Sequence, residues 1–317
     1  MRHLISLKEQ SGAELRTILD EATRLKKEAR AGKIQPYLAG KILILYFEKP
    51  STRTRLSFDS AMAELGGHPV LFDVGRTQFS LADFRDEIQA VMRFGDVLMM
   101  RALRAADVYT AASFNRIPII DGCSEKYHPC QTLADILTMA EYSGGVEKIG
   151  KVAWLGPENN VSNTLKIACA KLGIKIALAT PEKANPANVD PELNVMAEAT
   201  GLVTVTHDVK EALDGAAYVH TDTWMDMEFF QNGKIRPEYE AEYERRKKAY
   251  LPYQISTQLL EKYAPHARIM HCMPMHVGYE ITRDAIDHPN AVILDQAENR
   301  KHAQKAIIMW LLGVSAR

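Results

Sequence analysis

The sequence is organised around the stretch F-E-K-P-S-T-R-T-R, residues 47–55. An apolar run, residues 42–46, precedes it and has the length and composition of a buried strand. Apolar side chains then recur at helical spacing from Phe58 to Leu65, and Gly66-Gly67 predicts the end of this helix. Residues 51–54 are therefore expected where a strand is followed by the N-terminus of a helix.

This junction has the chemistry of a phosphate site. The first backbone N–H groups of a helix lack partners, and the helix dipole favours an anion beside them. Ser51, Thr52 and Thr54 add hydroxyl groups. Arg53 and Arg55 add guanidinium groups, which bind phosphate oxygens in bidentate fashion. A serine cap with two surface arginines in ion pairs is the alternative, but the concentration of these groups at one junction favours a phosphate pocket.

Composition limits the class of protein. A chain of 317 residues predicts two domains of ordinary size. The formal charge of −1 provides no general attraction to nucleic acid or to an anionic membrane. No apolar run approaches the roughly 20 residues of a bilayer span, and the N-terminus lacks a signal-peptide core. Four cysteines without C-x-x-C spacing and ten histidines without H-E-x-x-H predict a cytoplasmic protein with no metal site or disulfide framework.

Apolar runs with strand composition alternate with helical periodicity in two successive series. The first series of expected strands is 42–46, 69–72, 97–100 and 118–121. The second is 152–155, 174–179, 202–205, 217–220, 268–271 and 291–294. This alternation predicts βαβ units, and therefore an α/β fold with two doubly wound parallel-sheet domains. Ligands of such sheets bind at the carboxyl ends of the strands.

The expected helix at 132–142 is interpreted as the bridge between a first domain, residues 1–135, and a second domain, residues 136–299. The turn at 156–163 follows a strand but lacks G-x-G-x-x-G, so we reject a nicotinamide site there. Opposite charges spaced four residues apart in 237–248 predict an exposed helix without a binding role.

Three motifs, in this order, resemble the aspartate/ornithine carbamoyltransferase family over nearly the whole chain. They are F-x-x-P-S-T-R-T-R, H-P-C-Q at 128–131 and H-C-M-P at 271–274. The resemblance implies a domain that binds carbamoyl phosphate, a domain that binds an amine, and no cofactor. It also implies that the C-terminal helix, expected at 299–312 and assigned with residues 300–317 to the first domain, packs back on that domain.

The resemblance further implies a homotrimer, or a multiple of trimers, with shared active sites. In the family, the loop that corresponds to residues 73–80 reaches the site of a neighbouring subunit, which nominates Gln78 and also Arg76. An ordinary solvated loop is an equally weighted alternative for this polar, Gly-containing stretch.

The carbamoyl-phosphate site implied by the family draws on several segments. Its expected members are Ser51, Thr52, Arg53, Thr54, Gln78, Arg101, His128, Gln131 and Arg300. The expected catalytic residues are Arg101, His128, Cys272 and Arg300. The residues themselves support His128, because Pro129 predicts a helix start and places the imidazole at its edge, where it can polarise a carbonyl oxygen. A capping or packed histidine is the alternative.

The amine pocket is expected at strand ends of the second domain. Its expected members are Asn160, Asp222, Asp226, Met227, Cys272 and Met273. The carboxylate of Asp222 suits an ammonium group. H-C-x-P matches the ornithine branch of the family, but D-T-W-M-D-M-E at 222–228 departs from that branch's D-x-W-x-S-M-G. The added carboxylate of Asp226 would attract a cation and repel a substrate carboxylate.

These observations predict a transferase that moves the carbamoyl group of carbamoyl phosphate to the side-chain amine of L-ornithine, giving citrulline and phosphate, as in arginine biosynthesis. Putrescine or another ornithine-like amine remains open because of Asp226. A non-catalytic sensor of the same fold that binds carbamoyl phosphate also remains open, although carbonyl-polarising residues have no use in a sensor. A phosphotransferase is disfavoured because the sequence has no Walker motif.

Overall fold

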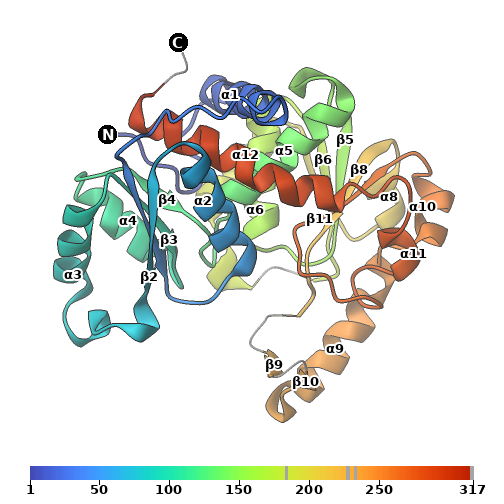
Figure 1. The fold of residues 1–317 in the computed structure, drawn as a ribbon. Coiled ribbons are helices and arrows are strands. Elements are labelled where there is room, and N and C mark those ends of the chain that lie inside the picture. The colour runs from blue at the N-terminus through green and yellow to red at the C-terminus, as the bar shows by residue number, and fades with distance from the viewer. Residues whose placement is uncertain (183–184, 226–228, 232–233, 315–317) are drawn as a thin grey trace.

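The computed structural model describes residues 1–182, 185–225, 229–231 and 234–314. They form two α/β domains, each built on its own parallel sheet (Figure 1). The inner strands, such as Ile42–Phe47, Val97–Arg101 and Lys151–Leu155, are largely apolar and buried, as expected for parallel sheets that are covered on both faces. The predicted fold class, two doubly wound parallel-sheet domains, is confirmed.

The first sheet has the order β2-β1-β3-β4, and all its strands are parallel. The strands are β1 (Ile42–Phe47), β2 (His68–Asp73), β3 (Val97–Arg101) and β4 (Ile119–Asp121). The helices of this part are α2 (Thr52–Glu64), α3 (Phe84–Val91) and α4 (Ala105–Ser113). Because the chain passes from β1 to β2 on one side and then to β3 on the other, the strand order switches between β1 and β3.

The second sheet has the order β11-β8-β5-β6-β7 and is also parallel. Its strands are β5 (Lys151–Leu155), β6 (Ile176–Ala179), β7 (Val203–Thr206), β8 (Ala216–Thr221) and β11 (Arg268–His271). Its helices are α6 (Asn160–Leu172), α7 (Pro191–Glu198), α8 (Val209–Leu213), α10 (Thr257–Tyr263) and α11 (Arg283–Ile286). Here the order switches between β5 and β8. Crevices at such switch points are where open α/β sheets bind ligands.

An excursion below the second sheet holds the antiparallel pair β9 (Phe230–Gln231) and β10 (Lys234–Ile235), followed by helix α9 (Glu240–Tyr250). The expected exposed helix in the charged stretch is thus present as α9. Among the described helices, none has the length and apolar character needed to cross a membrane.

Three long helices lie between and across the two sheets: α1 (Gly12–Arg30), α5 (Pro129–Ser143) and α12 (Ile293–Leu312). A capping box starts α1, because Ser11 Oγ accepts the Glu14 N–H and Glu14 accepts the Ser11 N–H. Helix α5 starts with Pro129 and stops at Gly144, whose φ of 78° lies in the left-handed region that favours glycine.

Helix α12 crosses both domains and packs on α5, α1, α2 and β11 (Figure 1). Lys301 and Lys305 of α12 form ion pairs with Glu64 of α2 at 2.6 and 2.8 Å. The buried Lys26 of α1 donates to Asn299 of α12 at 2.7 Å. The C-terminal helix is therefore joined to the first domain by charged contacts as well as by apolar packing.

The strand expected at 291–294 is wrong. Ala291 makes only an isolated bridge to Ile269, and α12 already begins at Ile293, six residues before the expected start. A four-residue apolar run is ambiguous between a strand and the first turn of a buried helix. Burial of Gln296, Asn299 and Ala303 shows that helical spacing continues through it.

Candidate active site

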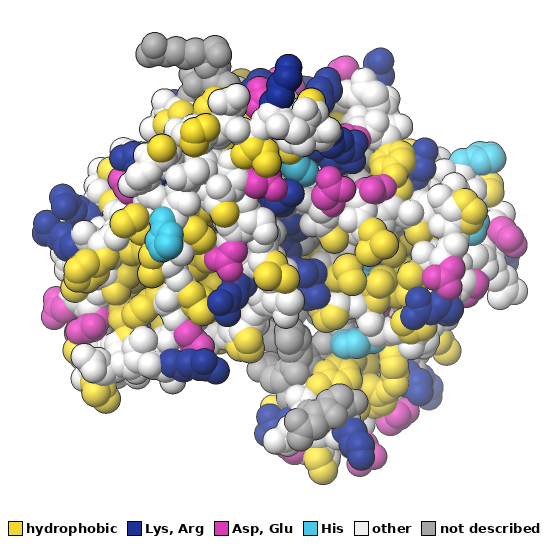
Figure 2. Space-filling model, in the orientation of Figure 1, with side chains coloured by type: hydrophobic (Ala, Val, Ile, Leu, Met, Phe, Trp, Pro, Cys, Tyr) yellow, Lys and Arg dark blue, Asp and Glu magenta, His cyan; other side chains and the backbone are white. Residues whose placement is uncertain are grey.

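The two strand-order switches bring their loops to one groove between the domains. Figure 2 shows that the surface is hollowed there and that Lys and Arg side chains lie along the hollow. In the first sheet, Phe47 at the end of β1 pairs with Arg101 at the end of β3, so Arg101 lies beside the junction that precedes α2. In the second sheet, Thr221 pairs with His271, so Asp222 and Cys272 follow neighbouring strand ends.

The predicted strand–helix junction is confirmed, with α2 beginning at Thr52. Ser51 Oγ donates to Thr54 Oγ1 at 3.0 Å. Within the described part of the chain it makes no side-chain cap to α2, so the first amide groups of this helix remain available to a ligand. Arg53 is half-buried on the first turn of α2.

Arg300 joins three helices at the same place. From α12, its Nη1 donates to Gln131 Oε1 on α5 at 2.7 Å, and its Nη2 donates to Thr54 Oγ1 on α2 at 3.1 Å. The side chain is only 3% exposed. The structure therefore brings together Thr54, Gln131 and Arg300, three expected members of the carbamoyl-phosphate site.

Three buried polar atoms near this point have no hydrogen-bond partner among the described residues. They are Arg101 Nε, His128 Nδ1 and Arg300 Nε. A buried polar group without a partner costs about 1–3 kcal/mol, and such groups are rare in native proteins. Polar atoms of three expected catalytic residues are thus oriented for partners that a bound anion or carbonyl oxygen would supply.

His128 stands at the N-terminal edge of α5, and its backbone N–H donates to Thr164 Oγ1 at 2.8 Å. Burial lowers the pKa of His128 well below its ordinary 6.5, and the positive charges of Arg300, Arg101 and Arg53 lower it further. The imidazole is therefore neutral near pH 7. A neutral imidazole in a cluster of guanidinium groups suits hydrogen bonding to a carbonyl oxygen without adding charge.

The lowered pKa of His128 predicts a pH dependence of stability. Below about pH 6.5 the unfolded chain binds a proton at this side chain that the folded protein does not bind, so the free energy of unfolding falls as the pH falls. His128→Asn should therefore lose less stability than the wild type between pH 7 and pH 5, as measured by urea unfolding.

Other groups contribute to the same pH profile. Burial also lowers the pKa of His271 to about 3 and of His302 to about 4, whereas it raises the pKa of Glu280 to about 7 and so acts in the opposite sense. The contribution of His128 is therefore the difference between variant and wild type in the stability lost from pH 7 to pH 5. His68→Asn, at an exposed position of β2, is the control. An unchanged acid slope in His128→Asn would contradict the prediction.

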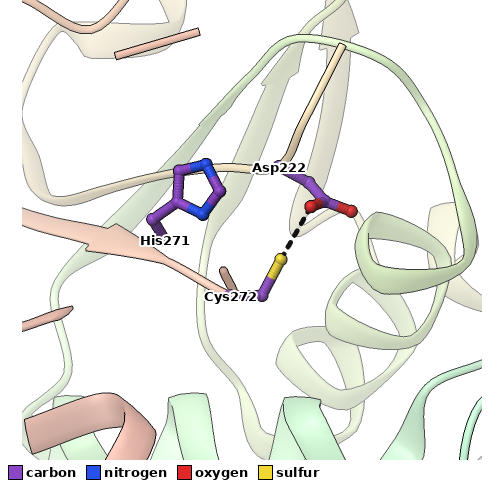
Figure 3. Close-up of side chains that lie close together, drawn as sticks. All are labelled: Asp222, His271 and Cys272. Atoms are coloured by element: carbon purple, nitrogen blue, oxygen red, sulfur yellow. Dashed lines mark hydrogen bonds between the residues drawn. The ribbon is translucent and has the colours of Figure 1, made fainter. Parts of the chain in front are cut away.

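Asp222 is the centre of the second half of the site. Its Oδ1 accepts a hydrogen bond from the Cys272 thiol at 2.9 Å (Figure 3). Oδ1 also accepts the Thr223 N–H at 2.8 Å, and Oδ2 accepts a hydrogen bond from Asn159 Nδ2 at 2.8 Å. Burial, followed by the nearby charge of Asp222, raises the pKa of Cys272 well above its ordinary value. Cys272 is therefore a protonated donor and not a thiolate nucleophile.

Arg53 connects the two halves electrostatically. Burial lowers the pKa of Arg53, the carboxylate charge of Asp222 opposes this shift, and the charge of Arg101 adds to it. Arg53 thus lies within electrostatic reach of both the first-domain arginine and the second-domain carboxylate. A ligand bound to Arg53 would be placed beside Asp222.

The two asparagines after β5 contact different parts of the protein. Asn160 Nδ2 donates to Ser124 O at 2.7 Å and contacts Cys123 Sγ at 3.1 Å, toward the loop after β4. Asn159, which sequence reasoning missed, reaches Asp222 and also caps α6 through the N–H groups of its second and third residues. The cap position before a helix was the sequence signal that could have identified Asn159.

The remaining expected residues lie elsewhere or cannot be placed. Gln78 is exposed, and Arg76 in the same loop pairs with Asp73 at 3.4 Å, so this loop lies at the surface of the single chain. Asp226 and Met227 lie outside the described residues. Met273 is partly buried against the second-domain core and has a φ of 60°, a costly conformation for a residue with a side chain.

Asp222, His271 and Cys272 carry ligand-type atoms within 4.8 Å of one another (Figure 3). These atoms already have protein partners. His271 Nδ1 accepts the Met273 N–H at 2.8 Å, and its Nε2 faces Glu280 at 3.2 Å. The Cys272 thiol donates to Asp222. We therefore interpret the group as a hydrogen-bonded cluster that needs no ion to be satisfied.

The geometry thus places a cluster of cationic side chains at the end of the first sheet and a hydrogen-bonded carboxylate at the end of the second. The family model "Aspartate/ornithine carbamoyltransferase, carbamoyl-P binding domain" matches residues 2–141. The model "Aspartate/ornithine carbamoyltransferase, Asp/Orn binding domain" matches residues 149–311. The chain belongs to the aspartate/ornithine carbamoyltransferase family.

Similar proteins carry names of the ornithine branch. The ornithine carbamoyltransferase of Archaeoglobus fulgidus is 39% identical over 315 residues, which cover 99% of this chain and 98% of that protein. That of Rhizobium meliloti is 38% identical over 314 residues, covering 98% and 99%. The solved structure of ornithine carbamoyltransferase from Pyrococcus furiosus has a TM-score of 0.89 at 37% identity and covers 99% of this chain and 98% of that chain. The predicted resemblance to the ornithine branch is confirmed.

Proposed function

We propose that this protein transfers the carbamoyl group of carbamoyl phosphate to the δ-amino group of L-ornithine, giving citrulline and phosphate. The observation that carries the proposal is the convergence of buried polar atoms of Arg101, His128 and Arg300, without protein partners among the described residues, beside the N-terminus of α2. The names of the relatives support the same reaction.

Residues 1–135, together with the C-terminal helix, would hold carbamoyl phosphate. The first amides of α2, the hydroxyls of Ser51, Thr52 and Thr54, and the guanidinium of Arg53 would bind the phosphate, because a helix N-terminus and bidentate arginine both favour a divalent anion. Arg101, His128 and Arg300 would then face the carbonyl oxygen of the carbamoyl group. Gln131 accepts a hydrogen bond from Arg300 and so holds its guanidinium in place.

Residues 136–299 would hold the amine. Asp222 is a buried carboxylate fixed by donors from three residues, and it lies within electrostatic reach of Arg53. This arrangement would attract an ammonium group toward the bound carbamoyl phosphate. Asn160, Cys272 and Met273 complete the part of the pocket within the described residues, on the loops that follow β5 and β11.

The chemistry then follows from charge and position. The uncharged amine nitrogen attacks the carbamoyl carbon, and negative charge develops on the carbonyl oxygen, where Arg101, His128 and Thr54 would stabilise it. The bond from carbon to the phosphate oxygen breaks, and the phosphate leaves and accepts the proton of the amine. Closure of the two domains would exclude water from the reactive anhydride.

Initial rates at saturating carbamoyl phosphate test the proposal. Ureido product should form fastest, by kcat/KM, with L-ornithine, and more slowly with putrescine, lysine, N-acetylornithine and aspartate. A higher kcat/KM with putrescine would overturn the choice of amine, and it would direct attention to Asp226. No ureido product with any amine would overturn the reaction and favour a sensor that only binds carbamoyl phosphate.

We further infer an assembly of trimers in which the loop of Gln78 completes the site of a neighbour. Several large apolar side chains are exposed on α2, on the edge strand β2 and in the segment between β2 and β3. They are Leu56, Val70, Leu71, Leu81 and Phe94. Exposed apolar side chains of this kind suit an interface between subunits.

The environment of the cysteines supports a cytoplasmic location. Cys123, Cys130, Cys169 and Cys272 are all buried free thiols. A protein with only reduced cysteines suits a reducing compartment. The proposed reaction requires no cofactor, because both the electrophile and the leaving group belong to carbamoyl phosphate.

A further inference from the structure

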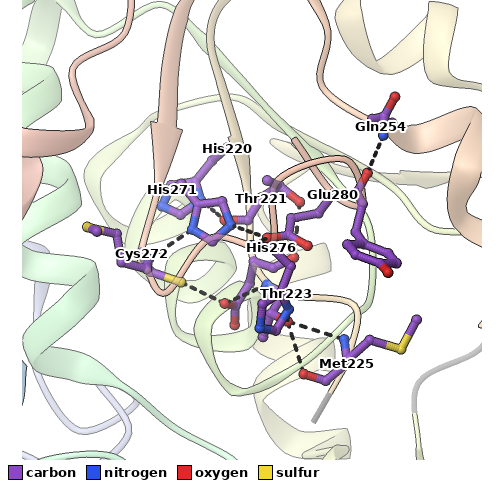
Figure 4. Close-up of polar contacts among 12 residues, drawn as sticks. His220, Thr221, Thr223, Met225, Gln254, His271, Cys272, His276 and Glu280 are labelled. Atoms are coloured by element: carbon purple, nitrogen blue, oxygen red, sulfur yellow. Dashed lines mark hydrogen bonds and ion pairs between the residues drawn. The ribbon is translucent and has the colours of Figure 1, made fainter. Parts of the chain in front are cut away.

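Glu280 is a buried carboxyl group that the proposed reaction does not use. Its side chain is fully buried behind the loop that carries Cys272. Oε1 accepts the backbone N–H of His276 and lies 3.2 Å from His271 Nε2 (Figure 4). Burying a carboxyl group at this depth is costly unless it is well hydrogen-bonded, so its place in the fold calls for a role.

The first branch from Glu280 leads to the Cys272 turn. His271 Nδ1 accepts the Met273 N–H at 2.8 Å, so the proton of the neutral ring resides on Nε2 and is donated to Glu280. Burial lowers the pKa of His271 to about 3, which keeps the ring neutral. The carboxyl group therefore selects the tautomer that holds the Met273 amide, and Met273 is the residue with the unusual positive φ.

The second branch leads to the turn after Asp222. His276 Nδ1 and Thr223 Oγ1 lie 2.8 Å apart (Figure 4). Thr223 Oγ1 also donates to Met225 O at 3.0 Å and accepts the Met225 N–H at 3.2 Å. This branch shapes the chain at the last described residue before 226–228, the segment in which the amine pocket was expected to continue.

Both branches of hydrogen bonds end at Asp222. The Cys272 thiol and the Thr223 N–H both donate to Asp222 Oδ1, at 2.9 and 2.8 Å. Asp222 is thus held by the loop of Cys272 and by the loop of Thr223. His271 holds the first of these loops and His276 holds the second, and Glu280 contacts both histidines. Gln254 fixes the far end of the loop that follows Cys272, because its Nε2 donates to Tyr279 O at 2.6 Å and to Gly278 O at 3.0 Å.

We propose that Glu280 is a positioning residue for the amine substrate: through His271 and His276 it holds the Cys272 turn and the Thr223–Met225 turn in the register that presents Asp222 to the amine. This inference rests on the proposed function and deepens it. It assigns Glu280 no contact with either substrate. Its effect should therefore appear in amine binding and should leave the phosphate pocket of the other domain intact.

Three variants test this role by steady-state kinetics. Glu280→Leu removes both acceptor contacts and should raise the KM for ornithine about tenfold, the effect of losing one buried hydrogen bond, with the KM for carbamoyl phosphate changed less than about twofold. Glu280→Gln keeps an acceptor at Oε1 and should restore the ornithine KM to within about threefold of wild type. His276→Ala breaks only the Thr223 branch, at a half-buried position, and should again raise only the ornithine KM.

Asp284→Asn is the matched control, because this exposed acid in the same segment hydrogen-bonds to Thr257 and contacts neither turn. Its ornithine KM should equal that of the wild type. If Glu280→Leu does not fold, His276→Ala decides alone. An unchanged ornithine KM in the folded variants, or an equal rise in both KM values, would overturn the positioning role. A wild type without carbamoyl transfer would instead overturn the proposed function.

Discussion

Replacing Arg53 with alanine should lower kcat/KM for carbamoyl phosphate by about a thousandfold. The half-buried guanidinium stands on the first turn of α2, within electrostatic reach of Asp222 and Arg101. Loss of two charge-assisted hydrogen bonds to a transferring group removes about 4 kcal/mol of transition-state stabilisation, which corresponds to about three powers of ten. Steady-state rates of ureido formation at limiting carbamoyl phosphate measure the effect.

Arg55→Ala is the matched control for this variant. Arg55 lies on the same turn of α2, but it is exposed and pairs with Asp59 at 3.5 Å. An exposed pair of this kind contributes little to stability, so this variant should keep near-normal kcat/KM. Both variants should unfold at temperatures close to that of the wild type. Near-normal turnover in Arg53→Ala would show that the phosphate pocket lies elsewhere.

Mixing two inactive variants should restore activity if the active sites are shared between subunits. In a mixed assembly, the Gln78→Ala subunit still has Arg53 and the Arg53→Ala subunit still has Gln78. A site that combines these two residues is intact. Random mixing makes about one site in four of this kind, so up to about a quarter of wild-type activity should return from two nearly inactive preparations. The subunits are mixed in mild denaturant, dialysed and assayed.

The pair Arg53→Ala and Arg300→Ala provides the control for this experiment. Both residues belong to the pocket of one chain, because Arg300 donates to Thr54 on the same helix as Arg53. No combination of these two variants can produce an intact site, and mixing them should restore nothing. Equal recovery from both mixtures would exclude sharing through Gln78. A monomer by light scattering at assay concentration would contradict the trimer itself.

The strand–helix junction at which we propose that phosphate binds was predictable because its sequence pattern is local. Ser51 to Thr54 occupy consecutive positions, and the strand before them and the helix after them each have a strong apolar pattern. The switch points of the sheets, and with them the meeting of Phe47 and Arg101, follow from strand order. Strand order is a property of the whole fold, and alternation alone predicted the parallel sheets but not which strands are neighbours.

Contacts between distant segments could not be predicted from composition and spacing. Arg300 meets Gln131 across 169 positions, and only the family resemblance placed them together. Nothing in the G-Y-E-I-T sequence around Glu280 indicates that this acid is buried, because burial depends on what packs over it. The contact of Asn159, and not of its neighbour Asn160, with Asp222 has a similar cause, because the direction of a side chain in a turn depends on backbone angles that the sequence pattern does not give.

The position of Arg300 on the last helix sets an order for the biosynthesis of a working subunit. Ribosomes deliver a chain from its N-terminus at about 5–20 residues per second, and domains fold as they emerge. The sheet of the first domain can form early, but its phosphate pocket lacks one wall until α12, Ile293–Leu312, leaves the exit tunnel and docks on α2 and α5. A nascent or prematurely terminated chain therefore cannot consume its labile substrate. We therefore expect carbamoyl transfer only from chains that include α12.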